Sequence, residues 1–328
     1  MALLQVQDLC VTLNTTHGPQ EVISHINFSI NAGEKLGIVG ESGCGKSITA
    51  LALMALLPPD SKTHGKIILA GQDILTLNSS KICSIRGNRI GMIFQEPMTA
   101  LNPVKQIGAQ ISESIRLHLK LTRKQTLERV IELMDKVGLC VTRFPLNLYP
   151  HQLSGGQRQR VMIAMAIACN PEILIADEPT TALDVTVQEQ ILDLILGLTD
   201  SSGMALIMIS HDLGVIAQTT QNVMVMYTGN SVEMGSTVDV FQNMLHPYTY
   251  GLFSAIPNVG SSLLPGRKRL CSIPGQVPEL HLRPRGCNFA GRCSSASTIC
   301  KEKEPMATRV SDHHQVWCYH PLTCEDKK

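Results

Sequence analysis

Hydrophobic and polar residues follow two different periods along the chain. The stretches LLQVQDLCVTL and INFSINAGEKLGIV are apolar or alternate in strand-length pieces, with a turn at residues 31–33. Two later apolar runs, EILIADEP and ALIMISHD, end on polar residues, and a segment with helical spacing from Val187 to Leu198 separates them. This alternation of strands and helices predicts an α/β fold with a parallel sheet.

A longer helical pattern fills the middle of the chain. From about Val104 to Leu139, apolar residues recur three and four positions apart, which is the spacing of a helix with one buried face. Thr122 and Gln125 fit a capping box at a helix start. We therefore expect a helical insert, at about residues 96–165, between two halves of the α/β core.

A glycine-rich loop, GESGCGKS at positions 40–47, lies between an apolar strand and the helix-like segment SITALALMALL. This is the sequence context of a phosphate-binding loop (P-loop). Gly40 and Gly45 permit a tight turn whose backbone N–H groups surround phosphate. Lys46 can reach the β- and γ-phosphates, and the Ser47 hydroxyl can bind Mg²⁺. The predicted ATP-binding residues are Gly40, Glu41, Ser42, Gly43, Cys44, Gly45, Lys46 and Ser47.

Cys44 lies in this loop at the start of the expected helix. Because a helix N-terminus lowers a thiol pKa, one hypothesis is a reactive thiolate. The alternative is a small residue that merely fits the turn.

Polar residues that follow apolar strands predict the rest of an ATP site. Asp177 and Glu178 end one such strand, Gln95 follows MIF, and His211 follows ALIMIS. The carboxyl ends of parallel strands share one sheet edge, where ligands bind. Asp177 would hold Mg²⁺ there, and Glu178 could accept a proton from an attacking water. The alternatives are two solvated acids and a structural histidine.

In chain order, these segments resemble the motifs of an ATP-binding cassette (ABC) ATPase over about residues 1–245. GESGCGKS resembles the Walker A motif, LSGGQ the signature, ILIADEP the Walker B motif and TALD the D-loop, while Gln95 and His211 match the Q-loop and the H-loop. The resemblance implies a core sheet that carries the P-loop, a helical subdomain and an antiparallel β subdomain. It implies Glu178, His211 and Gln95 as catalytic residues. It also implies Mg²⁺ ligands, namely Ser47, Asp177 and Gln95.

The resemblance further implies an ATP site shared between two chains. In the family, the signature binds the γ-phosphate held by the P-loop of the opposite subunit, and the free N–H donors of a helix N-terminus suit that anion. The residues concerned are Leu153, Ser154, Gly155, Gly156 and Gln157, with Asp184 in the D-loop. The family usually stacks an aromatic side chain on adenine, whereas the aligned segment CVTLNTTHG presents Leu13.

Near His246 the sequence becomes rich in proline and glycine, and six of the eleven cysteines lie between Cys271 and Cys324. HPYTYGLFSAIP, IPGQVPEL and GCNFAGRC resemble the C-terminal extension of ATPase subunits from bacterial oligopeptide, dipeptide and nickel importers. The chain is similar to the D-type member of these importers. We expect a small Cys-rich domain at residues 246–328.

Four of these cysteines have the spacing C-x5-C-x6-C-x17-C. Four thiolates suit either zinc or an iron–sulfur cluster, and the short C-x2-4-C pairs of structural zinc sites are absent. The importer branch holds a [4Fe–4S] cluster at this pattern, which ranks that cluster first and Zn²⁺ second. A surplus of free thiols is the alternative, and Cys271 and Cys324 fall outside the pattern. The expected ligands are Cys287, Cys293, Cys300 and Cys318.

Composition limits the partners of the chain. A formal net charge of +1 gives no bulk electrostatic attraction to nucleic acid or an anionic membrane, so no nucleic-acid partner is expected. No apolar run approaches the roughly 20 residues that span a bilayer. Membrane association would therefore come through a partner, and the resemblance implies the cytoplasmic face of the bacterial inner membrane as its place.

The resemblance implies an ATPase that powers import of a small solute, with di- or oligopeptides ranked first and nickel or a metal chelate as the alternative. The implied partners are a second ABC ATPase subunit, two membrane-spanning permease subunits and a solute-binding protein. A paralogue in a heterodimer is favoured over a second copy of the chain. The rival class is a soluble ABC ATPase that acts on DNA or the ribosome. The short spacing between Ser47 and Leu153 disfavours the DNA members, which usually carry long coiled-coil arms there, and the single P-loop disfavours the ribosomal members, which generally carry two cassettes.

Overall fold

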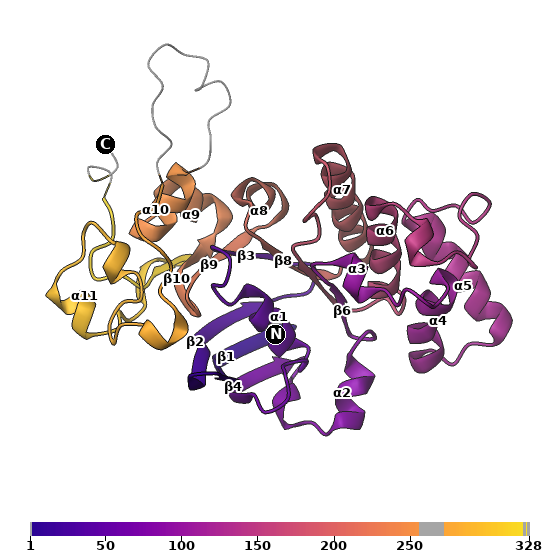
Figure 1. Ribbon diagram of the computed structural model, residues 1–328, viewed down its shortest axis with the longest axis horizontal. Coiled ribbons are helices and arrows are strands. Elements are labelled where there is room, and N and C mark those ends of the chain that lie inside the picture. Colours follow the sequence, from indigo (N-terminus) through magenta and orange to yellow (C-terminus); the bar gives the residue numbers. More distant parts are fainter. Residues whose placement is uncertain (1, 256–271, 324–325, 327–328) are drawn as a thin grey trace, which may run out of the picture.

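The computed structural model describes residues 2–255, 272–323 and 326, and places them in two sheets flanked by helices (Figure 1). The larger sheet has the strand order β11-β12-β10-β9-β3-β8-β7-β6. Its central strands are parallel: β9 (Asn222–Tyr227), β3 (Lys35–Val39), β8 (Ala205–Ser210), β7 (Ile173–Asp177) and β6 (Ile90–Ile93). Both faces of these strands are covered, one by helices and the other by α1 and the antiparallel sheet, which explains why strands β7 and β8 are buried along their whole length.

The smaller sheet is antiparallel and has the order β2-β1-β4-β5. Its strands are β1 (Leu4–Thr15), β2 (Gly18–Ile30), β4 (Lys62–Leu69) and β5 (Gln72–Asp73). The strand register shifts near Asp8, which has a positive φ of 52°. Gly65 passes so close to this irregularity that an added Cβ would lie 2.3 Å from the Asp8 carbonyl oxygen. Only glycine fits that approach.

Three helices form a subdomain at one end of the molecule: α4 (Ile107–His118), α5 (Arg123–Lys136) and α6 (Gly155–Ala166) (Figure 1). The predicted capping box at the start of α5 is confirmed, because Thr122 accepts from the Gln125 backbone and Gln125 accepts from the Thr122 backbone. The other helices are α1 (Lys46–Leu53), α2 (Ser79–Ile85), α3 (Pro97–Ala100), α7 (Val185–Ser202), α8 (Leu213–Thr219), α9 (Thr237–Asn243), α10 (Pro247–Ser254) and α11 (Thr298–Glu302). The predicted fold, with a P-loop sheet, a helical subdomain and an antiparallel β subdomain, is confirmed.

The C-terminal region continues the larger sheet. Strand β10 (Asn230–Ser236) pairs antiparallel with β9, β12 (His314–Val316) pairs with β10, and β11 (Thr308–Ser311) pairs with β12. Two short 3-10 turns, η4 (Leu280–Leu282) and η5 (Ala290–Arg292), precede α11 within this region. The boundary expected at residues 245–246 lies between α9 and α10 and stays a prediction.

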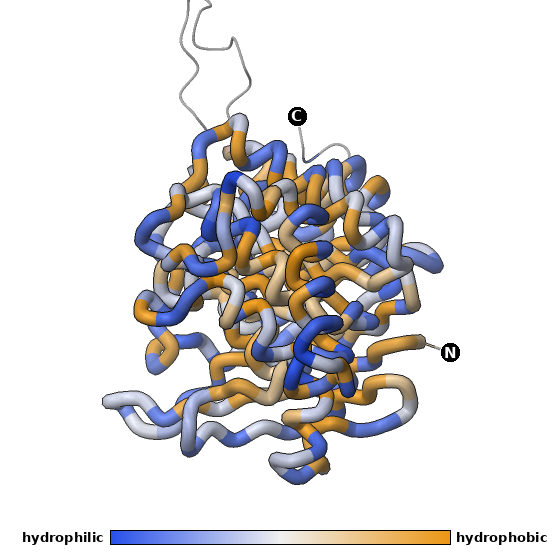
Figure 2. Tube along the Cα trace, turned by 90° about the vertical axis from the view of Figure 1, so that its right-hand side faces the viewer, coloured by the Kyte–Doolittle hydropathy of each residue, from blue (hydrophilic) through white to orange (hydrophobic). Residues whose placement is uncertain are grey.

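Hydrophobic residues gather in the interior and polar ones on the outside (Figure 2). Two core clusters form on opposite sides of the parallel strands, one beneath the helices of the subdomain and one between the parallel strands, α1 and the antiparallel sheet. Within the described residues, every helix is too short or too polar to cross a membrane.

Candidate functional site

The glycine-rich loop runs from the carboxyl end of β3 into α1. Gly40, Gly43 and Gly45 all have positive φ, at 155°, 77° and 103°. A Cβ added to Gly40 would lie 2.2 Å from the Met226 carbonyl oxygen of β9. Glycine is therefore required at Gly40 by close packing, and the loop presents the N-terminus of α1 to the sheet edge, where a helix attracts anions.

Lys46 is almost completely buried at the start of α1. Its Nζ donates hydrogen bonds to the carbonyl oxygens of Gly40 at 2.8 Å and Glu41 at 3.1 Å, and lies 3.9 Å from Glu178. The loop thus holds a buried ammonium at the sheet edge, with its own carbonyls as partners. This arrangement suits a bound polyanion.

Ser47 and Asp177 form the second element of the site. The Ser47 hydroxyl donates to the Asp177 carboxylate at 3.1 Å. Burial raises the pKa of Asp177, and the hydrogen bond from Ser47 opposes that shift. A hydroxyl beside a buried carboxylate is a donor set that fits Mg²⁺, which prefers oxygen ligands.

Glu178 lies in contact with two other predicted site residues, Gln95 and His211. One carboxylate oxygen, Oε2, accepts from Gln95 Nε2 at 3.1 Å and from the Thr181 hydroxyl at 3.0 Å, and lies 3.2 Å from His211 Nδ1. The Glu178 backbone N–H donates to Ile209 of the neighbouring strand at 2.9 Å, and its φ is 47°. The carboxyl ends of β6, β7 and β8 therefore bring Gln95, Glu178 and His211 together, as expected.

The LSGGQ segment lies on a different element, at the start of α6. Ser154 is the N-cap of α6, and its hydroxyl accepts from the Gln157 backbone N–H. Ser154 and Gly155 are exposed, and α6 packs against the helices of the subdomain and against α7. A Cβ added to Gly156 would lie 2.7 Å from Val187 on α7, whose own N-cap is Asp184. The signature is thus an open helix N-terminus beside the D-loop.

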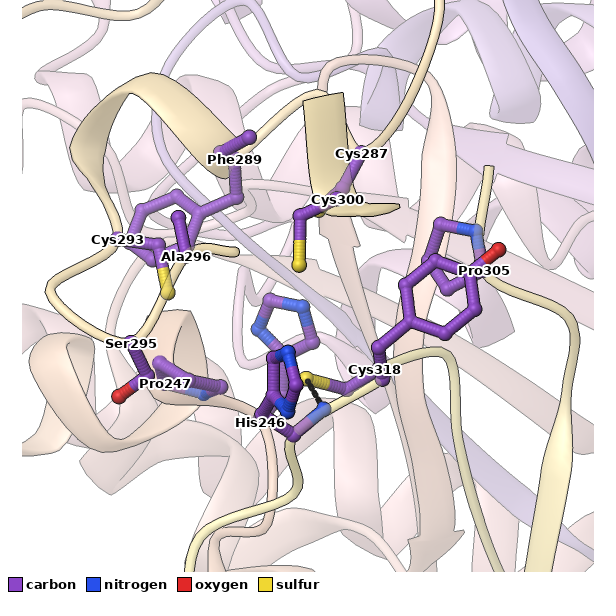
Figure 3. Close-up of a pocket in the computed structure, with 13 residues that line it drawn as sticks. His246, Pro247, Cys287, Phe289, Cys293, Ser295, Ala296, Cys300, Pro305 and Cys318 are labelled. Carbon is purple, nitrogen blue, oxygen red and sulfur yellow. Dashed lines mark hydrogen bonds between the residues drawn. The ribbon is translucent and has the colours of Figure 1, made fainter. Parts of the chain in front are cut away.

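The four predicted metal ligands line one pocket in the C-terminal region (Figure 3). Cys293, Cys300 and Cys318 turn their sulfur atoms toward the same space, and Cys287 lies beside them (Figure 3). Burial raises the pKa of Cys287 to about 11 and that of Cys318 to about 12. Among the described residues, no three of these sulfur atoms lie within 4.8 Å of one another, the distance that a shared single ion would require. Cys271 and Cys324 lie outside the described residues.

His246 is completely buried and lines the same pocket. Its Nδ1 accepts from the Tyr248 backbone N–H at 3.0 Å, so a neutral ring carries its proton on Nε2. Burial lowers the pKa of His246 to about 4, which keeps the ring neutral. Nε2 has no hydrogen-bond partner among the described residues. The pocket therefore contains a buried donor that lacks an acceptor.

Two residues of the C-terminal region reach the P-loop. Arg292 is almost completely buried, and its guanidinium forms a two-armed ion pair with Glu41, Nη1 to Oε2 at 2.7 Å and Nη2 to Oε1 at 3.1 Å. The Tyr248 hydroxyl accepts from the Glu41 backbone N–H at 2.8 Å.

Comparisons with known proteins show which family this site belongs to. A family model described as ABC transporter matches residues 23–181, and one for the C-terminal region of oligopeptide/dipeptide transporters matches residues 232–300. The oligopeptide transport ATP-binding protein OppD of Bacillus subtilis is 45% identical over 97% of this chain and 89% of its own length. A probable peptide ABC transporter ATP-binding protein of Sinorhizobium fredii is 47% identical over 97% of this chain and 94% of its own. The chain belongs to the ABC transporter family.

Solved structures agree with this assignment. The dimeric structure of the ATP-binding cassette MJ0796, in a post-hydrolysis state bound to ADP and Pi, aligns with 71% of this chain and 98% of its own at a TM-score of 0.64 and 26% identity. The structure of cbiO1 from Clostridium perfringens, part of the ABC transporter complex cbiONQ, aligns with 74% of this chain and 92% of its own at a TM-score of 0.62 and 27% identity. The chain is an ABC-type ATPase subunit.

One prediction within this ABC ATPase is wrong. Cys44 is buried, with 2% of its surface exposed, and burial raises its thiol pKa. Lys46 nearby opposes this shift but does not outweigh it. The alternative, a small residue that fits the turn, describes Cys44 better than a reactive thiolate does. Leu13, in the position expected to face adenine, is half-buried against the core beneath the antiparallel sheet.

Sequence reasoning missed three residues of this ABC ATPase: Tyr248 and Arg292, which contact Glu41, and His246, which faces the cysteine pocket. The sequence does contain a signal for His246 and Tyr248. In HPY at 246–248, the proline marks the first position of a helix, and His246 is its N-cap. Nothing in the sequence signals the contact of Arg292, because 251 positions separate it from Glu41.

Proposed function

We propose that the chain is the ATP-hydrolysing subunit of a bacterial importer for di- or oligopeptides. The observation that carries this proposal is the union, on one chain, of an ABC cassette with the C-terminal region of oligopeptide/dipeptide transporters. Relatives named as peptide or oligopeptide transport ATP-binding proteins match almost the whole chain, which favours peptides over nickel as the cargo.

In the proposed reaction, the buried Lys46 would contact the β- and γ-phosphates, and Ser47 and Asp177 would hold Mg²⁺ together with Gln95. Bound Mg²⁺ would offset the charge that develops on the transferred phosphoryl group. Glu178 would accept the proton of the attacking water. Gln95 and His211 both contact the Glu178 carboxylate, and would orient it toward that water.

The other half of each ATP site would come from a second ATPase subunit. The exposed N-terminus of α6, with Ser154 and Gly155, offers N–H donors to a phosphate on another chain. The dimeric cassette structure supports such a pairing. We favour a paralogue as the partner, because the chain resembles the D-type subunit of importers that carry two related ATPases.

We propose that the permease docks on the helical subdomain, at the cytoplasmic face of the inner membrane. A groove between α4 and α5 exposes the apolar side chains of Leu121 and Leu127 beside three cationic ones, Arg116, Arg123 and Lys124. An amphipathic cytoplasmic helix with acidic residues would match this groove. Two permease subunits and a solute-binding protein would complete the importer.

We further propose that Cys287, Cys293, Cys300 and Cys318 hold a [4Fe–4S] cluster in the C-terminal domain expected at residues 246–328, which continues the larger sheet. Ionising a buried thiol of raised pKa requires a neighbouring cation, and iron supplies one. His246 lines the same pocket, and its Nε2–H, which has no partner among the described residues, would suit an acceptor bound there. Because the short C-x2-4-C pairs of structural zinc sites are absent from this spacing, we rank the iron–sulfur cluster ahead of Zn²⁺.

The proposed function is tested on the intact assembly. The complex is purified from its own membranes through a tag on this chain, and its subunits and the solute retained by the binding protein are identified by mass spectrometry. We expect a permease pair, a second ATPase and bound peptides. Nickel or a metal chelate in the binding protein would refute the cargo, and a preparation without permease subunits would refute the transport role.

A further inference from the structure

We propose that the C-terminal region is a positioning element of the P-loop, and that Arg292 and Tyr248 set the affinity of the chain for nucleotide by fixing Glu41. The inference rests on the proposed binding of ATP at residues 40–47. It assigns a function in the ATP site to residues that lie outside the motifs of the cassette.

Glu41 is held at three separate groups. Its backbone N–H donates to the Tyr248 hydroxyl, its carbonyl accepts from Lys46 Nζ, and its carboxylate pairs with both arms of Arg292. Two of these three partners belong to the C-terminal region. A residue fixed at its N–H, carbonyl and carboxylate has little freedom, so the first turn of the P-loop is held in place before nucleotide arrives.

The holding groups are themselves rigid. Arg292 is 9% exposed, and its Nε donates to the Pro274 carbonyl at 2.9 Å. The guanidinium carbon lies 5.8 Å from the ring centre of Tyr227 and 5.9 Å from that of Phe289. Tyr248 is fully buried and packs on both rings, with centres 4.7 Å and 5.4 Å away. This aromatic cluster joins the P-loop to the region of the cysteine pocket, since Phe289 also lines that pocket.

Charge gives the ion pair a second consequence. Glu41 places a carboxylate in a loop that would surround a polyphosphate, and an uncompensated anion there would repel the ligand. The Arg292 guanidinium neutralises this carboxylate in a partly buried, two-armed pair, a geometry in which charge-assisted hydrogen bonds are strong. Removing Arg292 should therefore weaken nucleotide binding in two ways, by loosening the loop and by exposing the charge of Glu41.

The test measures the dissociation constant of ATP, by equilibrium dialysis, on the purified full-length chain and its variants, together with the melting temperature without nucleotide. We expect Arg292→Ala to bind ATP about tenfold more weakly, within the usual range of coupling between sites. Arg292→Lys keeps the positive charge but loses the two-armed geometry, so its ATP dissociation constant should lie between those of the parent and of Arg292→Ala. Tyr248→Phe should also weaken binding, because it leaves the Glu41 N–H without its acceptor.

A double variant separates the two consequences of the ion pair. Arg292→Ala with Glu41→Gln removes the uncompensated carboxylate, so it should bind ATP more tightly than Arg292→Ala alone. A contact that matters only for stability would not give this recovery. Should Arg292→Ala fail to fold, the Arg292→Lys and Tyr248→Phe variants carry the same test.

Arg89 provides a matched control. Its guanidinium also forms a two-armed pair, with Glu172, but at the amino ends of β6 and β7, the sheet edge opposite the P-loop. Arg89→Lys should lower the melting temperature and leave the ATP dissociation constant unchanged. The proposal is overturned if Arg292→Ala or Arg292→Lys binds ATP within twofold of the parent, or if Arg89→Lys weakens binding equally. A parent chain that binds no ATP would overturn the proposed function as well.

Discussion

Position 156 of the signature can require glycine for two reasons, internal packing of the chain or close approach of a phosphate, and substitutions can distinguish them. An added Cβ would lie 2.7 Å from Cγ1 of Val187, which is closer than real Cβ contacts. Gly155, its neighbour, would bring a Cβ only to an ordinary 3.5 Å from Leu183. Gly156→Ala should therefore strain the chain itself, whereas Gly155→Ala should not.

The size of each effect follows from the contact. Overpacking of this kind costs about 1–3 kcal/mol, and the half-exposed Val187 can shift, so we expect about 1 kcal/mol for Gly156→Ala. A phosphate oxygen bonded to a backbone N–H lies about 2.9 Å from nitrogen. A methyl group in its path would displace the phosphate by about 1 Å, a shift that can reduce turnover about 100-fold.

The assay combines urea unfolding of the chain, ATP binding by the isolated chain and ATP turnover by the assembled pair. Val187→Ala in the Gly156→Ala background removes the clash and should recover stability, measured as a favourable coupling energy in a double-mutant cycle. Turnover should stay low in the double variant. ATP binding to the isolated chain should survive, and should do so even in Gly156→Asp, which would place a carboxylate against the partner's phosphate.

Two results would refute this reasoning. If turnover returns together with stability in the Gly156→Ala, Val187→Ala variant, Gly156 serves packing alone. If the isolated chain loses ATP binding in Gly156→Asp, the signature serves its own P-loop, and no second subunit is needed to complete the site.

Three further predictions follow from the other sites. Glu178→Gln should keep ATP binding and lower turnover about 10²–10⁴-fold, because the amide cannot take a proton; turnover at the parent rate would exclude Glu178 as the base. The anaerobically purified chain should be brown, with about four irons and four sulfides, and Cys300→Ser should remove the colour. A colourless protein with stoichiometric zinc would favour Zn²⁺ instead, and a protein without metal would exclude both the iron–sulfur cluster and Zn²⁺. His246 has a pKa of about 4 in the folded chain against an ordinary 6.5, so the unfolded chain takes up its proton first and the free energy of unfolding falls as the pH drops through that window. Between pH 7.5 and 5 this loss amounts to about 2 kcal/mol, and urea unfolding of His246→Gln should lack it.

The sequence predicted those parts of the site that depend on local order. A strand, a glycine loop and a helix place Lys46 by chain connectivity alone. Parallel strands bring Gln95, Glu178 and His211 to one edge, because each residue follows the end of its own strand. No contact between distant surfaces was needed for these predictions.

The parts that the sequence did not predict depend on tertiary burial. The hypothesis for Cys44 used the helix N-terminus, which lowers a thiol pKa, but the Cβ-free turn at Gly40 lets the sulfur pack beneath the loop, and desolvation outweighs the helix. The pairing of Glu41 with Arg292 depends on how η5 lies against β9, and no periodicity in either segment encodes that. The orphaned Nε2–H of His246 likewise emerges only when the pocket around it is known.

The pairing of β12 with β10 has a consequence for synthesis of the chain on the ribosome. Strand β10 ends at Ser236, but the strand that covers its outer edge ends at Val316. At about 5–20 residues per second, the ribosome needs about 4–16 s to make the intervening segment. During that interval, a nascent cassette folded as far as β10 would present an unpaired strand edge, the kind of edge that recruits other chains. Crowded polysomes or slow codons in this segment should therefore favour aggregation of the newborn protein, although the finished protein has this edge covered.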